Sequence, residues 1–254
     1  MRRAALLGQV LFVCAVLGGW EGVSRWGWVD RSLLPPFSSV IRLLWEFLQS
    51  PAFLADLQVT GVEVLVAFLI GAPLGISTGL LLGEKLHWGE VVNPMIHFVL
   101  AVPQSIFLPI FILAFGIGFV EKVIFGVTHA YFVIVVNTVA AVRAVPPPLV
   151  IAARSFGATP SQIYTRIHLP AMLPLVVTGL RLGMIFNVIG VLLAEMYSST
   201  RGIGRQIFAW GESFQVTELL AGILLVSVAT IALNELMRLW EARVGRWRSI
   251  AQDS

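Results

Sequence analysis

The sequence predicts an all-α integral membrane protein of about six transmembrane helices. Of its 254 residues, 57% are hydrophobic and only 12% are charged, which is about half the charged fraction of soluble domains. The apolar residues gather in stretches of about 20 residues, the length a helix needs to cross a bilayer. All eight tryptophans lie at the ends of these stretches or between them, where an interfacial belt is expected. Lipid is therefore the expected solvent for most of the surface.

The predicted spans follow one another along the whole chain. All of them lack Asp, Glu, Lys and Arg except the fifth, which is interrupted only by Arg181. The third contains Pro103 and Pro109, and we predict one long, kinked span there because neighbouring helices can cover the freed backbone. Two half-length segments are the alternative. The six predicted spans are 4–20, 64–83, 91–120, 123–142, 169–194 and 219–234.

Basic residues predict the orientation of these spans. Arg2 and Arg3 precede the first span and would also suit a signal peptide, but no convincing cleavage site follows, so we expect a retained helix. With the amino terminus inside, eleven basic residues fall on or near the inner side and six on the outer side. The positive-inside rule then predicts that both termini are cytoplasmic, although Arg201 and Arg205 go against the trend.

The external segment between the first two spans predicts a helix at the membrane surface. Ser50 followed by Pro51 is typical of a helix cap with a first-turn proline, and predicts another short helix. The preceding stretch has one apolar face at helical spacing, as an interfacial helix does. Its residues are Ser39, Val40, Ile41, Leu44, Trp45 and Leu48.

The loop after the fourth span has more internal structure than a simple connection. Pro146-Pro147-Pro148 stops the preceding helix, and a short helix over 149–156 ends at Gly157, which can adopt a left-handed backbone. Thr159 caps a second helix with Pro160 in its first turn. Leu169-Pro170 is expected to break that helix before the chain enters the membrane again. A helix–glycine–helix of this kind suits docking into a partner, and an ordinary folded loop is the alternative.

This loop resembles the EAA loop of bacterial ABC-importer membrane subunits of the binding-protein-dependent type, and the neighbouring segments look like the nitrate/sulfonate/taurine branch. The resemblance extends from about Pro36 to the carboxyl end. It is carried by Leu74-Gly75, Pro103, Pro109, Phe115-Gly116-Ile117-Gly118, Ala152-Ala153, Gly157, Pro170-Ala171-Met172-Leu173-Pro174 with the preceding Leu169, Thr178-Gly179-Leu180-Arg181-Leu182-Gly183, Ala194-Glu195 and Gly202-Ile203-Gly204.

The resemblance implies a type I ABC-importer permease fold in the bacterial cell inner membrane, without a cofactor. The chain would form the path for a small solute such as a sulfonate, taurine or nitrate. Its implied partners are a dimer of cytoplasmic ATP-binding subunits, an extracytoplasmic (periplasmic) solute-binding protein and a second permease copy, either identical or closely related. The sequence contains no G-x-x-x-x-G-K-[ST] motif, so ATP hydrolysis is expected on the separate subunit and the chain is not an enzyme.

In the family, this loop is the coupling helix that fits a cleft in the ATPase. The family usually has Glu where this chain has Ile151, so docking here would depend on Arg154, helix shape and apolar contacts. The coupling residues that the resemblance implies are Ile151, Ala152, Ala153, Arg154, Phe156, Gly157, Leu169 and Pro170.

Polar residues within the spans could line the translocation path. Asn137, Thr178 and Asn187 are the main candidates, and interhelical hydrogen bonds are the alternative role. The other polar positions of this kind are Thr138, Ser227 and Thr230. The single domain (1–254) is thus expected to comprise the first span and external segment (1–57), spans two to four (58–142), the coupling loop (143–170), and spans five and six with a basic tail (171–254).

Other classes have weaker support. An ion-coupled secondary transporter would place acidic residues in mid-membrane, and the deepest ionisable residues found, Arg181 and Glu195, lie about 21 Å apart on a helix. A membrane-embedded hydrolase would need a nucleophile and base, and none is apparent. Basic residues exceed acidic ones by only three, 17 against 14, which argues against nucleic acid. The lone Cys14 and the scattered histidines predict no metal site, and Gly202-x-Gly204 predicts a turn.

Overall fold

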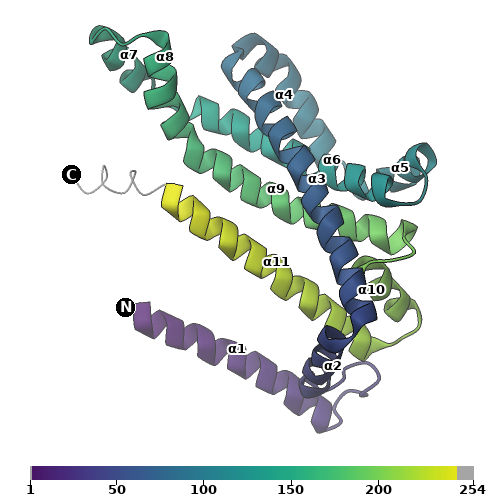
Figure 1. The fold of residues 1–254 in the computed structure, drawn as a ribbon. Helices are drawn as coiled ribbons and strands as arrows, with labels where there is room; N and C mark the ends of the chain where they lie inside the picture. The colour runs from purple at the N-terminus through teal and green to yellow at the C-terminus, as the bar shows by residue number, and fades with distance from the viewer. Residues whose placement is uncertain (1, 245–254) are drawn as a thin grey trace.

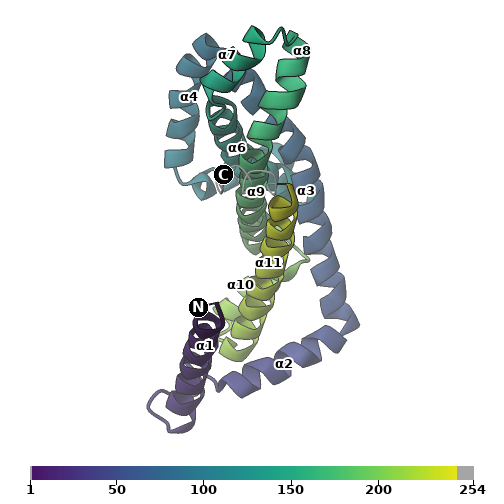
Figure 2. The same cartoon turned by 90° about the vertical axis from the view of Figure 1, so that its left-hand side faces the viewer.

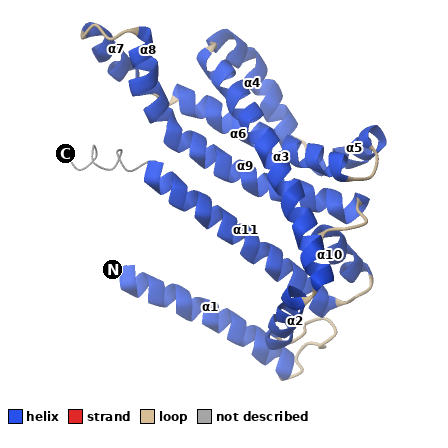
Figure 3. Ribbon diagram, viewed as in Figure 1, coloured by secondary structure: helices blue, strands red, loops and turns tan. Residues whose placement is uncertain are grey.

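The computed structural model describes residues 2–244, and within them every regular element is a helix (Figure 3). Five helices are long and apolar enough to cross a membrane, or six if one bent pair counts as a single span. The predicted all-α membrane fold is confirmed. The helices are α1 (Arg2–Arg25), α2 (Phe37–Gln49), α3 (Pro51–Glu84), α4 (Leu86–Ala101), α5 (Leu108–Phe115), α6 (Phe119–Arg143), α7 (Pro147–Ser155), α8 (Pro160–Ile163), α9 (Leu169–Ser198), α10 (Ile203–Glu212) and α11 (Val216–Val244).

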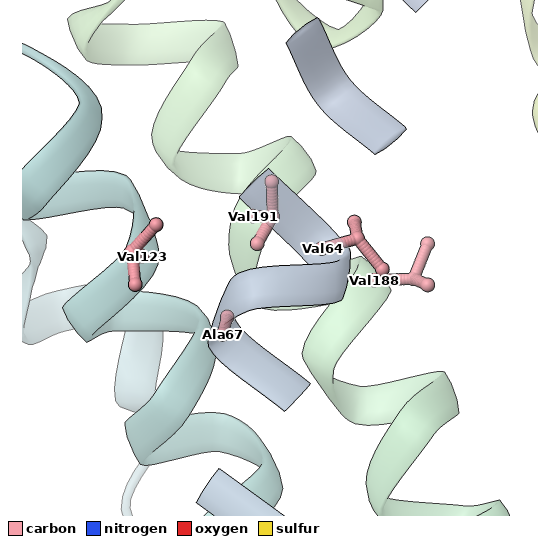
Figure 4. Packing of buried hydrophobic residues seen from close by; sticks show 5 residues of the cluster. All are labelled: Val64, Ala67, Val123, Val188 and Val191. Atoms are coloured by element: carbon pink, nitrogen blue, oxygen red, sulfur yellow. The ribbon is translucent and has the colours of Figure 1, made fainter. Parts of the chain in front are cut away.

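Helix α6 is the centre of the bundle, and α3 and α9 pack along it (Figure 1). Figure 4 shows one point where the three helices meet: Val64 from α3, Val123 from α6, and Val188 and Val191 from α9 form a buried cluster with Ala67. In contrast, α1 contacts the rest of the chain mainly through α2 (Figure 2). The α7–α8 segment, the start of α1 and the end of α11 lie on the same side of the bundle, and α2 and α10 lie on the other (Figure 1).

Glycines allow α3 and α9 to approach α6 closely. A Cβ atom added to Gly75 would lie 2.9 Å from the Cβ of Ile134, and one added to Gly79 would lie 2.5 Å from the Cβ of Thr138. From the opposite side, a Cβ on Gly183 would lie 2.5 Å from Cγ1 of Ile134. Lipid chains are as apolar as these side chains, so close packing rather than burial from water holds the helices together.

The α3–α6 packing makes a direct prediction. We expect Gly79→Val to lower the thermal stability of the purified protein by about 1–3 kcal/mol, because the added atoms overpack against Thr138. Gly61→Val is the matched control, since a Cβ at Gly61 on the same helix has no neighbour within 4 Å. Equal melting temperatures of the two variants in detergent would contradict this account of the packing.

The segment predicted as one kinked span is instead broken. Helix α4 ends at Ala101, a short 3-10 helix (Gln104–Phe107) follows, and α5 leaves at 83° to α4. Val102 is extended, as the residue before a proline prefers, and Pro103 has no N–H to continue the helix. The alternative of two half-length segments describes these helices better than a continuous helix does.

The connection between α2 and α3 follows the predicted cap but not the predicted length. The Ser50 hydroxyl accepts a hydrogen bond from the N–H of Phe53 at 3.4 Å, and Pro51 occupies the first turn. The helix that begins there is not short: it continues for 34 residues, about 50 Å, which exceeds the bilayer core. Its first turns lie beside α2 and α10, where the Phe47 ring stacks against both Phe53 and Trp210, with ring centroids 4.7 and 5.1 Å apart.

Candidate functional site

The α7–α8 segment is a compact helical hairpin. Pro147 and Pro148 occupy the first turn of α7, where a missing N–H has no cost. At the other end, Gly157 has φ +76°, and its N–H donates to the carbonyl of Arg154 at 2.9 Å while the N–H of Ala158 donates to that of Ala153 at 3.0 Å. This pair of bonds is a Schellman motif. The predicted left-handed glycine is confirmed, and it sets the angle between the two helices.

Helix α8 begins with the predicted cap. The Thr159 hydroxyl accepts from the N–H of Gln162 at 3.3 Å, and the Gln162 side chain accepts from the N–H of Thr159 at 2.9 Å. These reciprocal bonds form a capping box. They fix the start of the second helix independently of tertiary contacts.

The break predicted at Leu169-Pro170 is wrong. Helix α8 passes through a π-helical turn (Tyr164–His168) directly into α9, and the whole stretch from Pro160 to Ser198 is one apolar helical run of 39 residues. Pro170 cannot donate a backbone hydrogen bond, and its ring would clash with an α-helical carbonyl four residues earlier. The wider π turn just before it relieves both problems without ending the helix.

One face of the hairpin is anchored and the other is exposed. Val150 and Ile167 pack against the buried cluster of Ala141, Val145 and Met172. Phe156 is 91% exposed and Ile151 is 63% exposed, and no residue of α7 is fully buried. The other predicted coupling residues are also accessible: Ala152, Arg154, Gly157 and Leu169 are exposed, and Ala153 and Pro170 are partly buried. Most of the predicted residues are therefore accessible to a partner, and their role in coupling stays a prediction.

At the far end of α9, a second group of functional candidates was missed by the sequence analysis. Glu195 is fully buried, and its carboxylate accepts hydrogen bonds from the Thr60 hydroxyl on α3 at 2.7 Å and from the N–H of Gly204 at 2.7 Å. The Ile203 N–H donates to the Thr60 oxygen at 2.9 Å. A Cβ on Gly202, which has φ +111°, would lie 2.1 Å from the Glu195 carboxylate. The predicted turn at Gly202-x-Gly204 thus forms the start of α10, and the buried Glu195 carboxylate accepts a hydrogen bond from the first turn of that helix.

An ion pair lies next to this group. Lys122, in the first turn of α6, pairs with Glu63 of α3 and donates to the Ser199 hydroxyl at 3.0 Å. The neighbouring Glu121 accepts from the Ser198 hydroxyl at 2.8 Å. Glu63, Glu121 and Lys122 are at most 4% exposed. The helices α3, α6, α9 and α10 are therefore tied together by buried polar contacts, which we call the polar junction.

The polar junction adds three ionisable residues to the two that the sequence analysis placed deepest in the spans, Arg181 and Glu195. Glu63, Glu121 and Lys122 are buried within the chain, as Glu195 is. These three lie at the edges of the uncharged stretches, and their helices begin before those stretches do. Arg181 itself pairs with Glu241 of α11 at 3.2 Å. One sequence signal could have indicated the junction: Asp56, Thr60 and Glu63 are spaced so that they share one face if the second span begins earlier than its uncharged stretch.

The path-lining candidates make contacts within this chain. Asn187 is fully buried and donates to the carbonyl of Val64 on α3 at 2.7 Å, and Thr178 donates to Glu241 on α11 at 2.6 Å. Asn137 donates to the carbonyl of Val133 in its own helix. Thr138 is fully buried, Thr230 is partly buried and Ser227 is exposed. A path-lining role stays a prediction. Within residues 2–244, no group of three or more metal-binding side chains is found.

Apolar helices packed through glycines, with an exposed helical hairpin continuous with one of them, define a multi-pass membrane protein. The chain belongs to the family described as "Binding-protein-dependent transport system inner membrane component", which matches residues 71–249. It is therefore a permease subunit of an ABC importer, not an enzyme. Membership implies a separate ATPase subunit and a solute-binding protein as partners, and excludes the alternative of an ion-coupled secondary transporter.

Curated relatives support this assignment over most of their length. The chain is 27% identical over 248 residues to the "Putative aliphatic sulfonates transport permease protein SsuC" of Bacillus subtilis, covering 98% of this chain and 90% of the relative. It is 26% identical to the "Taurine transport system permease protein TauC" of Escherichia coli, covering 94% and 89%.

Solved structures show the same fold. A chain of the inward-facing MetNI methionine ABC transporter superposes with a TM-score of 0.65 at 20% identity, covering 76% of this chain and 96% of that one. A chain of a bacterial alginate ABC transporter, in complex with its alginate-bound periplasmic protein, superposes with a TM-score of 0.59 at 15% identity, covering 96% and 93%. The expected type I importer fold is confirmed.

Proposed function

We propose that α7 docks into the ATPase subunit and that this contact couples ATP hydrolysis to solute movement. The observation that carries the proposal is Phe156: an aromatic side chain that is 91% exposed, held at the tip of a helix closed by a Schellman turn. Burying such a side chain in a partner's cleft would contribute about 1.5–3 kcal/mol. Ile151, also exposed, extends the same apolar surface where the family usually has Glu.

The coupling step follows from the continuity of the helix behind this surface. Since α8, the π turn and α9 form one helical run, a displacement of α7 has only the hydrogen-bonded turn at Gly157 to pass before it reaches that run and the polar junction at its far end. The junction then moves α3, α6 and α10 together with α9. ATP binding would therefore shift the bundle between two states, as alternating access requires.

Docking is tested with Ala153→Arg. We expect this variant to insert in the membrane normally but to lose copurification with the ATPase subunit, because a bulky charge enters the proposed contact. Gln49→Arg is the control, with the same new side chain at an exposed position on the opposite side of the bundle. A normal ATPase complex on a sizing column with Ala153→Arg would rule the docking surface out.

We further propose that two identical copies of the chain enclose the path, with both termini in the cytoplasm. Little of α1 is buried in the single chain, which leaves apolar surface for lipid or a second copy. Native mass spectrometry of the purified complex distinguishes a homodimer from a pair of related chains.

The orientation of the chain is tested by labelling. A cysteine introduced at Ser161, with Cys14 replaced by Ala, should react with an impermeant maleimide only in inside-out vesicles. Labelling in right-side-out vesicles alone would reverse the orientation.

The solute is proposed to be a small sulfonate, such as an alkanesulfonate or taurine. The proposal rests on the relatives named above, which are permeases for these compounds by name. Deletion of the gene should abolish growth on a sulfonate as the sole sulfur source and leave growth on sulfate unchanged. Unimpaired growth on every sulfonate tested, with loss of uptake of another solute such as nitrate, would reassign the substrate.

A further inference from the structure

The loop that joins α1 to α2 lies on the opposite side of the bundle from α7–α8 (Figure 1). A basic hollow is lined by this loop and by the helix turns next to it. Its volume is about 400 Å³, and it is lined by Arg25, Arg31 and Arg42, with Pro36, Ser38 and Ser39. The lining thus brings together three guanidinium groups and two hydroxyls, which are donors suited to a tetrahedral oxyanion.

The chain builds a fixed scaffold for this hollow. The Trp20 indole N–H donates to the carbonyl of Pro35 at 2.9 Å, and the buried Ser24 hydroxyl donates to that of Leu34 at 2.7 Å. Both bonds hold the connecting loop against α1. Glu21 accepts from the Ser38 N–H at 3.0 Å and from its hydroxyl at 2.8 Å, and so caps α2, whose own N-cap position is Pro36. Together these bonds hold the loop and the start of α2, which carry Arg31 and Arg42, against α1.

Charge in the hollow is not balanced internally. Glu21 pairs with Arg25 at 2.6 Å, which neutralises one of the three arginines. Arg31 and Arg42 have no carboxylate within 4.0 Å among residues 2–244, although Asp30 is adjacent in sequence and Glu46 lies one turn along α2. Two guanidinium groups therefore remain for a ligand, and the ligand they favour is an anion.

The surroundings indicate where that anion resides. Trp26 and Trp28, in the loop beside the hollow, are each 73% exposed, and Trp45 of α2 is 65% exposed. Tryptophans exposed in this way mark the level of the lipid headgroups. On α2, Ile41, Trp45 and Leu48 form an exposed apolar stripe, as expected of a helix lying in the interface. The predicted helix is present, its place at the membrane interface stays a prediction, and Arg42 follows Ile41 of the stripe in the sequence.

We propose that this hollow binds the phosphate of an anionic lipid headgroup, with Arg31 and Arg42 as its ligands. Arginine recognises phosphate through paired N–H donors, and the Ser39 hydroxyl, which also lines the hollow, supplements them, whereas the Ser38 hydroxyl already donates to Glu21. A headgroup with net negative charge is favoured over a zwitterionic one, because a zwitterionic headgroup carries its own cationic group, which competes with the arginines for the phosphate. The bound lipid would fix α1, which otherwise contacts the rest of the chain mainly through α2, at the membrane surface. A free oxyanion, such as a sulfonate, has the same chemistry and is the competing source.

The test compares lipid binding by the full-length protein and by charge variants. Purified protein is titrated with phosphatidylglycerol or phosphatidylcholine and bound lipid is counted by native mass spectrometry. We expect phosphatidylglycerol binding to weaken about tenfold in Arg42→Gln and in Arg31→Gln, and to weaken less in Arg42→Lys, which keeps the charge but loses the paired donors. Arg205→Gln, which removes an equally exposed arginine outside the hollow, should bind as the unmodified protein does.

Three outcomes would overturn the proposal. Equal phosphatidylglycerol binding by Arg42→Gln, Arg31→Gln and Arg205→Gln would show that the hollow is not the site. Displacement of the lipid by millimolar-range methanesulfonate or inorganic phosphate, with the same dependence on Arg42, would assign the hollow to a free oxyanion. Unchanged lipid binding together with loss of solute-binding-protein association in Arg42→Gln would assign it to that protein. Because Arg31 lies in an exposed loop, its variant separates ligand binding from any misfolding of α2.

Discussion

Replacing Gly157 with Val is expected to abolish most ATP-driven uptake while leaving the protein in the membrane. At φ +76° a residue with a side chain costs about 1–2 kcal/mol, and a β-branched one more. The Schellman turn would open, the bonds from Gly157 and Ala158 to α7 would be lost, and the exposed face of α7 would no longer have a fixed angle to α8. Uptake in reconstituted vesicles should fall about tenfold or more.

The expected loss comes from strain in the backbone at position 157 and not from a clash with packed side chains, and a matched variant tests the difference. Apart from its two chain neighbours, a Cβ at Gly157 has no neighbour within 4 Å, but at positive φ it lies too close to the adjacent carbonyl oxygen. Gly157→Asn should therefore keep substantially more uptake than Gly157→Val, since asparagine adopts the left-handed backbone more readily. ATPase activity that no longer responds to the solute-binding protein is the expected accompaniment. Equal and normal uptake in both variants would remove the turn from the coupling mechanism.

Local signals in the sequence were sufficient for the helix ends that carry their own caps. Ser50 with Pro51, Thr159 with Pro160, and Gly157 all lie where their backbone chemistry predicts. Each of these ends is fixed by bonds within a few residues, so no knowledge of the tertiary structure is needed. The composition alone likewise indicated a membrane protein, because too few charges are present to cover a soluble surface.

Prolines were harder to interpret, because their effect depends on the backbone around them. Pro103 was expected to kink a helix and instead ends it, whereas Pro170 was expected to end a helix and instead follows a π turn. A proline removes one hydrogen bond in each case, but whether the chain bends, breaks or widens depends on which neighbouring groups donate to the freed carbonyl. That information is not contained in the residues next to the proline.

The polar junction could not be predicted from single spans, because its members come from four helices. Asp56, for example, accepts from the side chain of Gln206 on α10 at 2.8 Å, a contact between residues 150 positions apart. The spans were predicted as stretches without charged residues, so any charged residue at the edge of a helix was assigned to a loop outside the membrane. Lys122, counted as an outer loop charge, is 4% exposed in the first turn of α6. Only the folded bundle shows that this charge has an internal partner.

The second large effect is expected from Lys122→Met. This change keeps the length of the side chain but leaves Glu63, which is 1% exposed, without its cation. Removing one partner of a buried ion pair typically costs about 3–5 kcal/mol, a large fraction of the 5–15 kcal/mol that stabilises most folded proteins. We expect a clearly lower melting temperature in detergent and poor yield of the intact permease.

Two further variants separate the loss of the pair from the loss of a lysine. Lys85→Met replaces the only other lysine, which is exposed, and should change stability by no more than about 0.5 kcal/mol. The double variant Lys122→Met with Glu63→Gln removes both charges and should recover part of the loss, because no uncompensated charge then stays buried. If the double variant were instead as unstable as the sum of its two single changes, the ion pair would contribute nothing specific. The stability of this end of the bundle would then depend on the hydrogen bonds of Glu195 and the turn into α10.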